Sequence, residues 1–120
     1  MSYRILYAED EDQTRSIVTD ELRRAGYVVD TAADGEEAIR RLESASYDLV
    51  LLDIRMPGKS GIDVLRFLRE RNLRPRIIML TAVEEISISI RSMKLGANDY
   101  VTKPFRLEEL FNAIERILRR

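Results

Sequence analysis

The sequence predicts an α/β fold in which five strands alternate with five helices, so that one parallel sheet carries helices on both faces. Short apolar runs of strand length recur along the chain, and each is followed by a segment whose apolar residues return every three or four positions. Nearly continuous apolar strands are typical of parallel sheets that are covered on both faces. Right-handed βα crossovers connect such strands.

The first βα unit begins with an apolar run at residues 5–8, which is too short for a helix and ends at acidic residues 9–12. From Asp12 onward, Val18, Leu22 and Ala25 keep helical spacing, and a glycine follows at the position of a left-handed C-cap. We expect a strand over 5–8 and a helix over 12–25.

The next elements are a β-branched strand over 27–32 and a helix that begins after the turn Asp34-Gly35. The apolar side of that helix carries Ala38, Ile39 and Leu42. Residues 48–53 form the most apolar run of the chain, which predicts a central strand that ends on the carboxylate of Asp53.

The second half of the chain repeats this alternation. Residues 56–61 are rich in proline and glycine and predict a loop. The expected elements after it are a helix over 62–71, a strand over 76–81, a helix over 84–95, a strand over 97–102 and a helix over 107–118. The most common arrangement of five such units is the flavodoxin-like strand order 2-1-3-4-5. At 120 residues, we expect one domain over 1–120.

Composition excludes several function classes. The chain has no cysteine and no histidine, so thiolate, zinc-thiolate and imidazole chemistry are ruled out. A net charge of -1 gives no electrostatic footprint for nucleic acid or anionic membranes, and we expect no direct contact with either. No run is long enough to span a bilayer or to form a signal peptide, which favours a cytoplasmic location.

Charged and hydroxyl residues stand where four of the predicted strands end: Glu9 and Asp10, Asp53, Thr81 and Lys103. Parallel strands bring these ends to one edge of the sheet, where open α/β folds place their sites. Two carboxylates about 5 Å apart repel by roughly 3 kcal/mol at an effective dielectric constant of about 20. We therefore expect a cation there, and oxygen donors in a shallow site favour Mg²⁺ over a calcium cage.

The same residues resemble a socket for a phosphoryl group. Lys103 would supply positive charge and Thr81 a hydroxyl donor, so that both, with the metal, hold the phosphoryl oxygens. Phosphoryl transfer depends on positioning and charge neutralisation, and a carboxylate such as Asp53 can act as the nucleophile and form an acyl phosphate.

Several ordered motifs together resemble the response-regulator receiver domain of two-component signalling. They are the acidic pair Glu9-Asp10, the segment 48–58 around Asp53, Leu80-Thr81-Ala82, and the segment 96–105 that contains Tyr100 and Lys103. The resemblance covers the whole chain.

The resemblance implies that Asp53 accepts a phosphoryl group from the phosphohistidine of a histidine kinase or a histidine phosphotransfer protein. It implies Mg²⁺, for which Mn²⁺ can substitute, bound by Asp10, Asp53 and the backbone carbonyl of Arg55, with Glu9 acting through water. Most members of the family have aspartate where this chain has Glu9. The resemblance also implies that the Lys103-Pro104 peptide bond is cis.

The resemblance further implies a switch pair and a kinase-docking surface, and the apolar stripes of the helix over 84–95 indicate a second partner surface. Thr81 would move toward the phosphoryl group while Tyr100 turns inward. In the helix over 84–95, we expect Ile88 and Leu95 to face the sheet. Ile90 and Met93, with Phe111, would then form a partly exposed patch beside Tyr100 that contacts an effector or a second copy. The kinase would dock on Ile17, Pro104 and Phe105.

Other readings of these residues stay open. Glu9 and Asp10 could form an acidic helix cap, Thr81 a turn, Lys103 a surface lysine and Tyr100 an ordinary packed aromatic. Ile17 could pack at an edge, and the helix over 84–95 could be buried more deeply than expected.

Two other functions also use such residues. A magnesium-dependent phosphatase of the haloacid-dehalogenase type wants a second aspartate two positions after the nucleophile, where this chain has Arg55. A flavin- or nucleotide-binding module on the same fold would need a glycine-rich phosphate loop after the first strand, where residues 9–12 are acidic.

Overall fold

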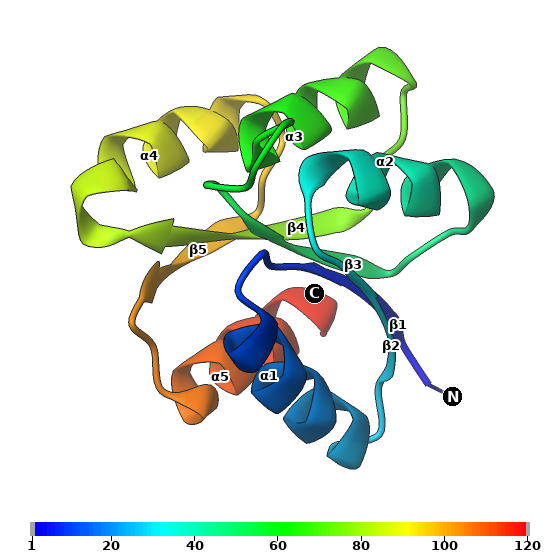
Figure 1. The fold of residues 1–120 in the computed structure, drawn as a ribbon, viewed down its shortest axis with the longest axis vertical. Coiled ribbons are helices and arrows are strands. Elements are labelled where there is room, and N and C mark those ends of the chain that lie inside the picture. Colours follow the sequence, from blue (N-terminus) through cyan, green and yellow to red (C-terminus); the bar gives the residue numbers. More distant parts are fainter. Residues whose placement is uncertain (1, 120) are drawn as a thin grey trace.

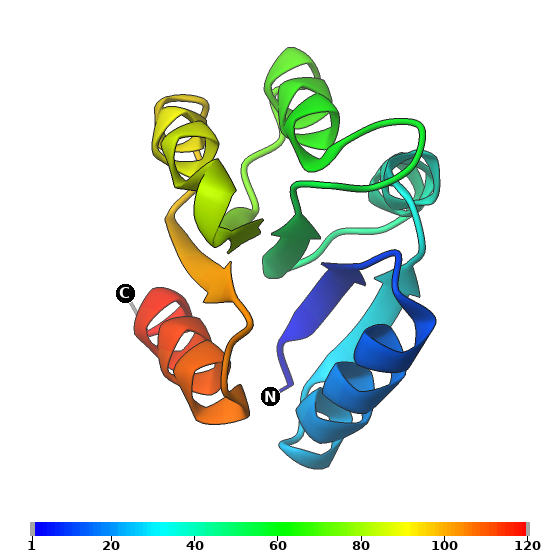
Figure 2. The ribbon, with the colours of Figure 1, turned by 60° about the vertical axis from the view of Figure 1, so that its left-hand side comes forward.

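The computed structural model describes residues 2–119, which form one five-stranded parallel sheet in the order β2-β1-β3-β4-β5. Helices α1 and α5 cover one face of the sheet, and α2, α3 and α4 cover the other (Figures 1 and 2). The predicted fold class and strand order are confirmed. Among the described residues, no helix is both long and apolar enough to cross a membrane.

The elements alternate along the chain as predicted. The strands are β1 (Arg4–Ala8), β2 (Val28–Ala32), β3 (Leu49–Asp53), β4 (Arg76–Ala82) and β5 (Asp99–Lys103). The helices are α1 (Asp12–Arg24), α2 (Gly35–Ser44), α3 (Gly61–Glu70), α4 (Ile86–Lys94) and α5 (Leu107–Leu118), with a 3₁₀ turn η1 (Val83–Glu85) before α4.

The sheet separates two apolar layers. Every residue of β3 is buried, because this strand lies between β1 and β4 and has helices on both faces. Alternate side chains such as Val50 and Leu52 join the layer under α2, α3 and α4, while Leu49 and Leu51 join the layer under α1 and α5. Burial on both faces explains why β3 reads as an unbroken apolar run.

Local sequence signals fix the loop that follows β3. Ser60 caps α3 by accepting a hydrogen bond from the amide of Asp63, whose carboxylate accepts one from the Ser60 amide in return. Gly61 opens the helix, and a Cβ there would collide with the carbonyl oxygen of Asp53. Only a glycine lets α3 approach the end of β3 this closely.

Two predicted boundaries around α4 are wrong. Helix α4 begins at Ile86 rather than at residue 84, because the 3₁₀ turn Val83–Glu85 precedes it, as often happens at helix N-termini. Strand β5 begins at Asp99 rather than at residue 97. Asn98 completes the connection, since its amide donates to the carbonyl of Ile77 and its side chain accepts from the Ile77 amide.

Helix α4 places its apolar residues unusually. Ile88 and Leu95 pack against the core, and Ile90 and Met93 are exposed, as the sequence predicted. The most buried α4 positions, however, are Ser89 and Ser92. Apolar periodicity does not reveal a polar inner face, so this face could not be predicted from the sequence.

Candidate functional site

Three carboxylates meet at the carboxyl edge of the sheet. Glu9 follows β1 and Asp53 ends β3, and these strands are neighbours with Ala8 opposite Leu52. One carboxylate oxygen from each of Glu9, Asp10 and Asp53 lies within 4.8 Å of the others. Glu9 and Asp53 are buried, whereas Asp10 is exposed. The parallel topology therefore brings together the acidic residues that the sequence singled out.

Lys103, the last residue of β5, reaches the same cluster. Its ammonium group lies 2.7 Å from Glu9 Oε1 and 2.7 Å from Asp53 Oδ2. Burial alone would lower the pKa of Lys103, but hydrogen bonds to Asp53 and Glu9 outweigh burial and raise this pKa. The lysine therefore stays charged and neutralises part of the acidic cluster.

The carboxyl group of Asp53 has a perturbed pKa. Burial raises the pKa of Asp53 to about 6. The hydrogen bond from Lys103 offsets part of this rise, and the negative charge of Glu9 adds to it. At neutral pH most of the population is still the carboxylate, which is the nucleophilic form. Strongly perturbed carboxyl groups in a cleft are typical of functional sites.

The donor set fits a small divalent cation. Three carboxylates facing one ammonium leave two formal negative charges, and all the carboxylate donors are hard oxygen atoms. Asp10 and Asp53 line a cavity of about 540 Å³, which leaves room for water ligands. Mg²⁺ commonly binds through one or two carboxylates and several waters.

Backbone contacts orient Glu9. Its Oε2 accepts a hydrogen bond from the amide of Glu11 at 3.2 Å, and the Arg15 guanidinium donates to the Glu9 carbonyl at 2.8 Å. Asp12, in the first turn of α1, pairs with the other end of that guanidinium. Glu9 thus belongs to the buried cluster, while Asp12 belongs to the start of the helix.

The predicted switch residues lie on the neighbouring strands β4 and β5. Thr81 is fully buried, and its hydroxyl donates to the carbonyl of Ala82 at 3.1 Å. Tyr100 is partly buried and packs against the core layer under α2, α3 and α4. The Lys103-Pro104 peptide bond is cis, as the resemblance implied.

One ion pair at the site was missed by the sequence analysis. The Arg55 amide donates to Asp53 Oδ1 at 3.3 Å, and its guanidinium pairs with Glu85 in the turn before α4. Glu85 is buried, although it lies in a stretch that the sequence marks only as a helix start. A buried charge is revealed by its surroundings in the fold rather than by sequence spacing.

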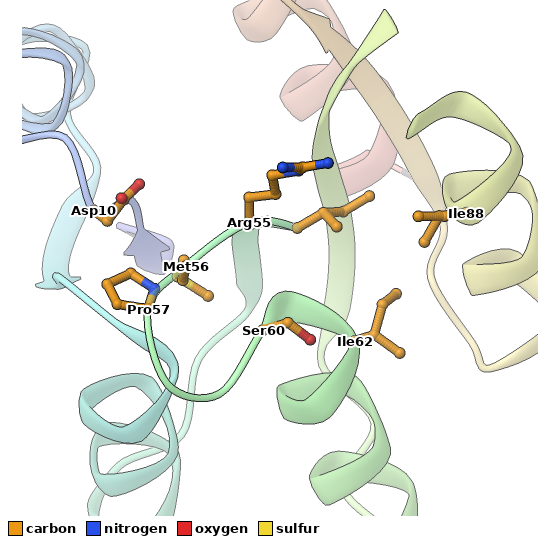
Figure 3. Close-up of a pocket in the computed structure, with 8 residues that line it drawn as sticks. Asp10, Arg55, Met56, Pro57, Ser60, Ile62 and Ile88 are labelled. Carbon is orange, nitrogen blue, oxygen red and sulfur yellow. The ribbon is translucent and has the colours of Figure 1, made fainter. Parts of the chain in front are cut away.

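Arg55 also lines a second cavity. A cavity of about 570 Å³ lies between the β3–α3 loop and α4, with Asp10 and Arg55 on its rim (Figure 3). Its wall is mainly apolar, and Ile62 and Ile88 face it from α3 and α4 (Figure 3). Arg55 lines both this hollow and the 540 Å³ cavity around the acidic cluster.

The predicted partner residues differ in exposure. Ile17 on α1 is 53% exposed and Ile90 on α4 is 55% exposed, so neither packs in the core. Met93 and Pro104 are also exposed. Phe105 and Phe111 are partly buried against the layer under α1 and α5.

Comparisons with known proteins give a consistent picture. The family model described as the response regulator receiver domain matches residues 5–115. The alkaline phosphatase synthesis transcriptional regulatory protein PhoP of Bacillus subtilis is 41% identical over 120 residues, which are 100% of this chain and 50% of that protein. The regulatory protein VanRB of Enterococcus faecalis is 42% identical over 120 residues, which are 100% of this chain and 54% of that protein.

A solved structure agrees with these relatives. The structure of a putative response regulator from Chloroflexus aurantiacus is 35% identical, has a TM-score of 0.89 and is covered over 100% of both chains. The chain spans about half the length of the curated relatives named above, at 50% and 54%. By the match over residues 5–115, the chain belongs to the response regulator receiver domain family, the signalling domains of two-component systems.

Proposed function

We propose that residues 1–120 form one phosphoacceptor unit, in which Asp53 accepts a phosphoryl group from a phosphohistidine in a Mg²⁺-dependent reaction. The observation that carries this proposal is the position of Asp53, whose carboxylate lies within 4.8 Å of two other carboxylates and 2.7 Å from the Lys103 ammonium. The donor is a histidine kinase or a histidine phosphotransfer protein.

In the transfer, a carboxylate oxygen of Asp53 bonds to phosphorus as the bond between phosphorus and the donor imidazole nitrogen breaks. The electron pair of that bond leaves with the imidazole, and Asp53 becomes an acyl phosphate. Lys103 neutralises charge on the phosphoryl oxygens and restrains the acceptor carboxylate. The low exposure of Asp53 limits access of water to the new anhydride.

The metal would be held by Asp10, Asp53 and the backbone carbonyl of Arg55, with Glu9 acting through water. When bound, Mg²⁺ supplies positive charge that offsets the acidic cluster and polarises the phosphoryl oxygens. Mn²⁺ can take the same place, since it accepts the same oxygen donors.

Phosphorylation then shifts a conformational population. The Thr81 hydroxyl leaves the carbonyl of Ala82 and turns to the phosphoryl group, while Tyr100 moves further inward. These movements remodel the face formed by α4, β5 and α5. Ile90, Met93 and Phe111 on that face contact an effector or a second copy, and Ile17, Pro104 and Phe105 contact the phosphodonor.

A phosphatase of the haloacid-dehalogenase type is the weaker candidate. Such an enzyme needs an acid-base carboxyl group two positions after its nucleophile, and Arg55 occupies that position. The Arg55 guanidinium pairs with Glu85 and has no proton that it could give up at neutral pH. We therefore expect each protein molecule to retain one phosphoryl group rather than to release phosphate steadily.

Intact-mass spectrometry after incubation with acetyl phosphate tests the proposal. The wild-type chain should gain one phosphoryl group only when Mg²⁺ is present, and Asp53→Asn should gain none. Asp20→Asn, on the exposed surface of α1, serves as the matched control and should behave as the wild type. Continuous release of phosphate from a simple phosphoester, over many turnovers, would favour the phosphatase instead.

A further inference from the structure

A buried tyrosine on β1 carries a hydroxyl group that the fold leaves unpaired. Tyr7 is fully buried in the apolar layer under α1 and α5. Within residues 2–119, its hydroxyl has no hydrogen-bond partner. A phenylalanine would fill the same space without burying an unpaired polar group, which is costly. The hydroxyl is therefore available to a partner that arrives in another state of the protein.

Tyr7 and Glu9 present their side chains to the same face of the sheet. Side chains alternate along a strand, and Glu9 extends the pairing of β1 with β2, since its amide donates to the carbonyl of Ala32 at 2.9 Å. The Cα atoms of Tyr7 and Glu9 are therefore about 7 Å apart. Tyr7 also lies opposite Leu51, which is two positions before Asp53. Tyr7 is thus one side-chain step behind both buried carboxylates.

The charges of the acidic cluster act on the Tyr7 hydroxyl. Burial raises the pKa of Tyr7 far above its ordinary value, and the negative charges of Glu9 and Asp53 raise this pKa further. The hydroxyl therefore keeps its proton throughout the neutral pH range. A hydroxyl that donates to a carboxylate forms a charge-assisted hydrogen bond, which is stronger than a bond between neutral groups.

We propose that Tyr7 is a positioning residue whose hydroxyl donates to the Glu9 carboxylate when phosphorylation draws Lys103 away from it. This inference rests on the proposed role of Asp53 as phosphoacceptor. In the unphosphorylated protein, the Lys103 ammonium lies 2.7 Å from both Glu9 Oε1 and Asp53 Oδ2. The lysine then satisfies Glu9, and the Tyr7 hydroxyl is not needed.

Phosphorylation changes the position that the Lys103 ammonium prefers. The acyl phosphate removes the negative charge from the Asp53 carboxylate and adds a multiply charged anion with three acceptor oxygens. The ammonium follows this charge and loses its contact with Glu9 Oε1. Glu9 is only 1% exposed, so bulk water does not replace the lost donor. A buried carboxylate that loses its cation is strongly destabilised unless another donor reaches it.

The Tyr7 hydroxyl supplies that donor. Glu9 Oε2 already accepts from the Glu11 amide at 3.2 Å, so Oε1 is the atom that loses its partner. The Glu9 side chain has three rotatable bonds and can turn Oε1 toward Tyr7, whose ring is held by the surrounding core. The phosphorylated state thus gains a hydrogen bond that the unphosphorylated state lacks. Tyr7 therefore shifts the population toward the phosphorylated conformation.

Beryllium fluoride tests the proposal, because it forms a stable phosphoryl analogue on a carboxylate. The wild type, Tyr7→Phe and Tyr27→Phe are titrated with it in the presence of Mg²⁺, and binding is followed by fluorine NMR. Tyr7→Phe should bind the analogue about tenfold more weakly, because one hydrogen bond to a charged group is lost. Tyr27 precedes β2 at the opposite end of the sheet, so Tyr27→Phe should bind as the wild type does.

Urea denaturation of the same variants in chelator separates a positioning role from a structural one. Without the analogue, the urea midpoint of Tyr7→Phe should equal or exceed that of the wild type, because the variant buries no unpaired hydroxyl. A lower midpoint of Tyr7→Phe in chelator, or an unchanged affinity for the analogue, overturns the proposal and leaves the role of Asp53 intact. A wild type that binds none of the analogue overturns both.

Discussion

The ammonium group of Lys103 lies 2.7 Å from Asp53 Oδ2, although the two residues are 50 positions apart in the chain. They meet because β3 and β5 flank β4 in a parallel sheet and both end at the same edge. The same ammonium lies 2.7 Å from Glu9 Oε1. One lysine therefore stabilises two buried carboxylates.

Lys103→Ala should destabilise the protein when divalent cations are absent. Removing the ammonium leaves Glu9 and Asp53 buried without their shared cation, at an expected cost of about 2–4 kcal/mol in the free energy of unfolding at pH 7. We expect the variant still to bind Mg²⁺ and to gain more stability from it than the wild type, while the switch is uncoupled from phosphorylation.

Urea denaturation with and without Mg²⁺ measures both effects. Lys59→Ala, in the exposed loop after β3, is the matched control and should change stability by less than about 0.5 kcal/mol. Equal stability of Lys103→Ala and the wild type in chelator would contradict the assigned ion pairs.

The pH dependence of stability should reveal the raised pKa of Asp53. Because burial raises this pKa to about 6, the folded state favours the protonated carboxyl group more strongly than the unfolded state does. The stability that the protonated Asp53 carboxyl group contributes is fully present below about pH 4 and is lost as pH rises through about 6. In chelator, Asp53→Asn should therefore be more stable than the wild type by about 1–3 kcal/mol at pH 7.

Chemical denaturation of both proteins between pH 4 and pH 8 checks this prediction. The stability difference should grow from pH 4 to a little above pH 6 and then level off toward pH 8. A difference that stays constant from pH 4 to pH 8 would mean that the carboxyl group of Asp53 is not perturbed in the folded protein.

Magnesium should raise the melting temperature through the acidic cluster. A ligand that binds only the folded state at one hundred times its Kd adds about 2.7 kcal/mol of stability. Asp10→Asn should weaken Mg²⁺ binding about tenfold or more, since it removes one of a few charged donors. A magnesium titration followed by differential scanning fluorimetry gives the affinities, with Asp20→Asn as the control. The same titration curve for Asp10→Asn and Asp20→Asn would place the metal elsewhere.

Gly61→Ala should disturb the site, although Gly61 itself is not one of the proposed metal or phosphoryl ligands. The added Cβ would collide with the carbonyl oxygen of Asp53, so the loop after β3 must shift. We expect a loss of about 1–3 kcal/mol in stability, and a Mg²⁺ affinity that falls because Asp53 and the Arg55 carbonyl move together. Denaturation and magnesium titration of the same preparation check both effects. Unchanged metal affinity in a destabilised variant would show that the loop backbone does not take part in the site.

The alternation of strands and helices could be predicted from periodicity, and the strand order was expected as the most common arrangement of five such units. Four of the five predicted strands end at a charged or hydroxyl residue, and a parallel sheet brings such ends to one edge, so Glu9, Asp53 and Lys103 were expected together. The burial of Glu85 and its pairing with Arg55 could not be predicted in this way. That contact joins two loops, and its geometry depends on how the turn after β4 is wound.

The buried serines of helix α4 could not be predicted from the sequence pattern for a similar reason. Its exposed residues Ile90 and Met93 were predicted from apolar stripes, but its most buried positions, Ser89 and Ser92, were not. Hydrophobic periodicity gives no weight to buried serines. The start of β5 was misplaced because Asn98, a turn residue, replaces a strand hydrogen bond with its side chain.

Chemical trapping of the acyl phosphate tests directly whether Asp53 is the phosphoacceptor. The protein is incubated with acetyl phosphate and Mg²⁺ and then reduced with borohydride, which converts an aspartyl phosphate to homoserine. Peptide sequencing by mass spectrometry should find homoserine at position 53, in a yield that depends on Mg²⁺. Homoserine at another position, or an unmodified Asp53 in protein that has taken up phosphate, would contradict the account.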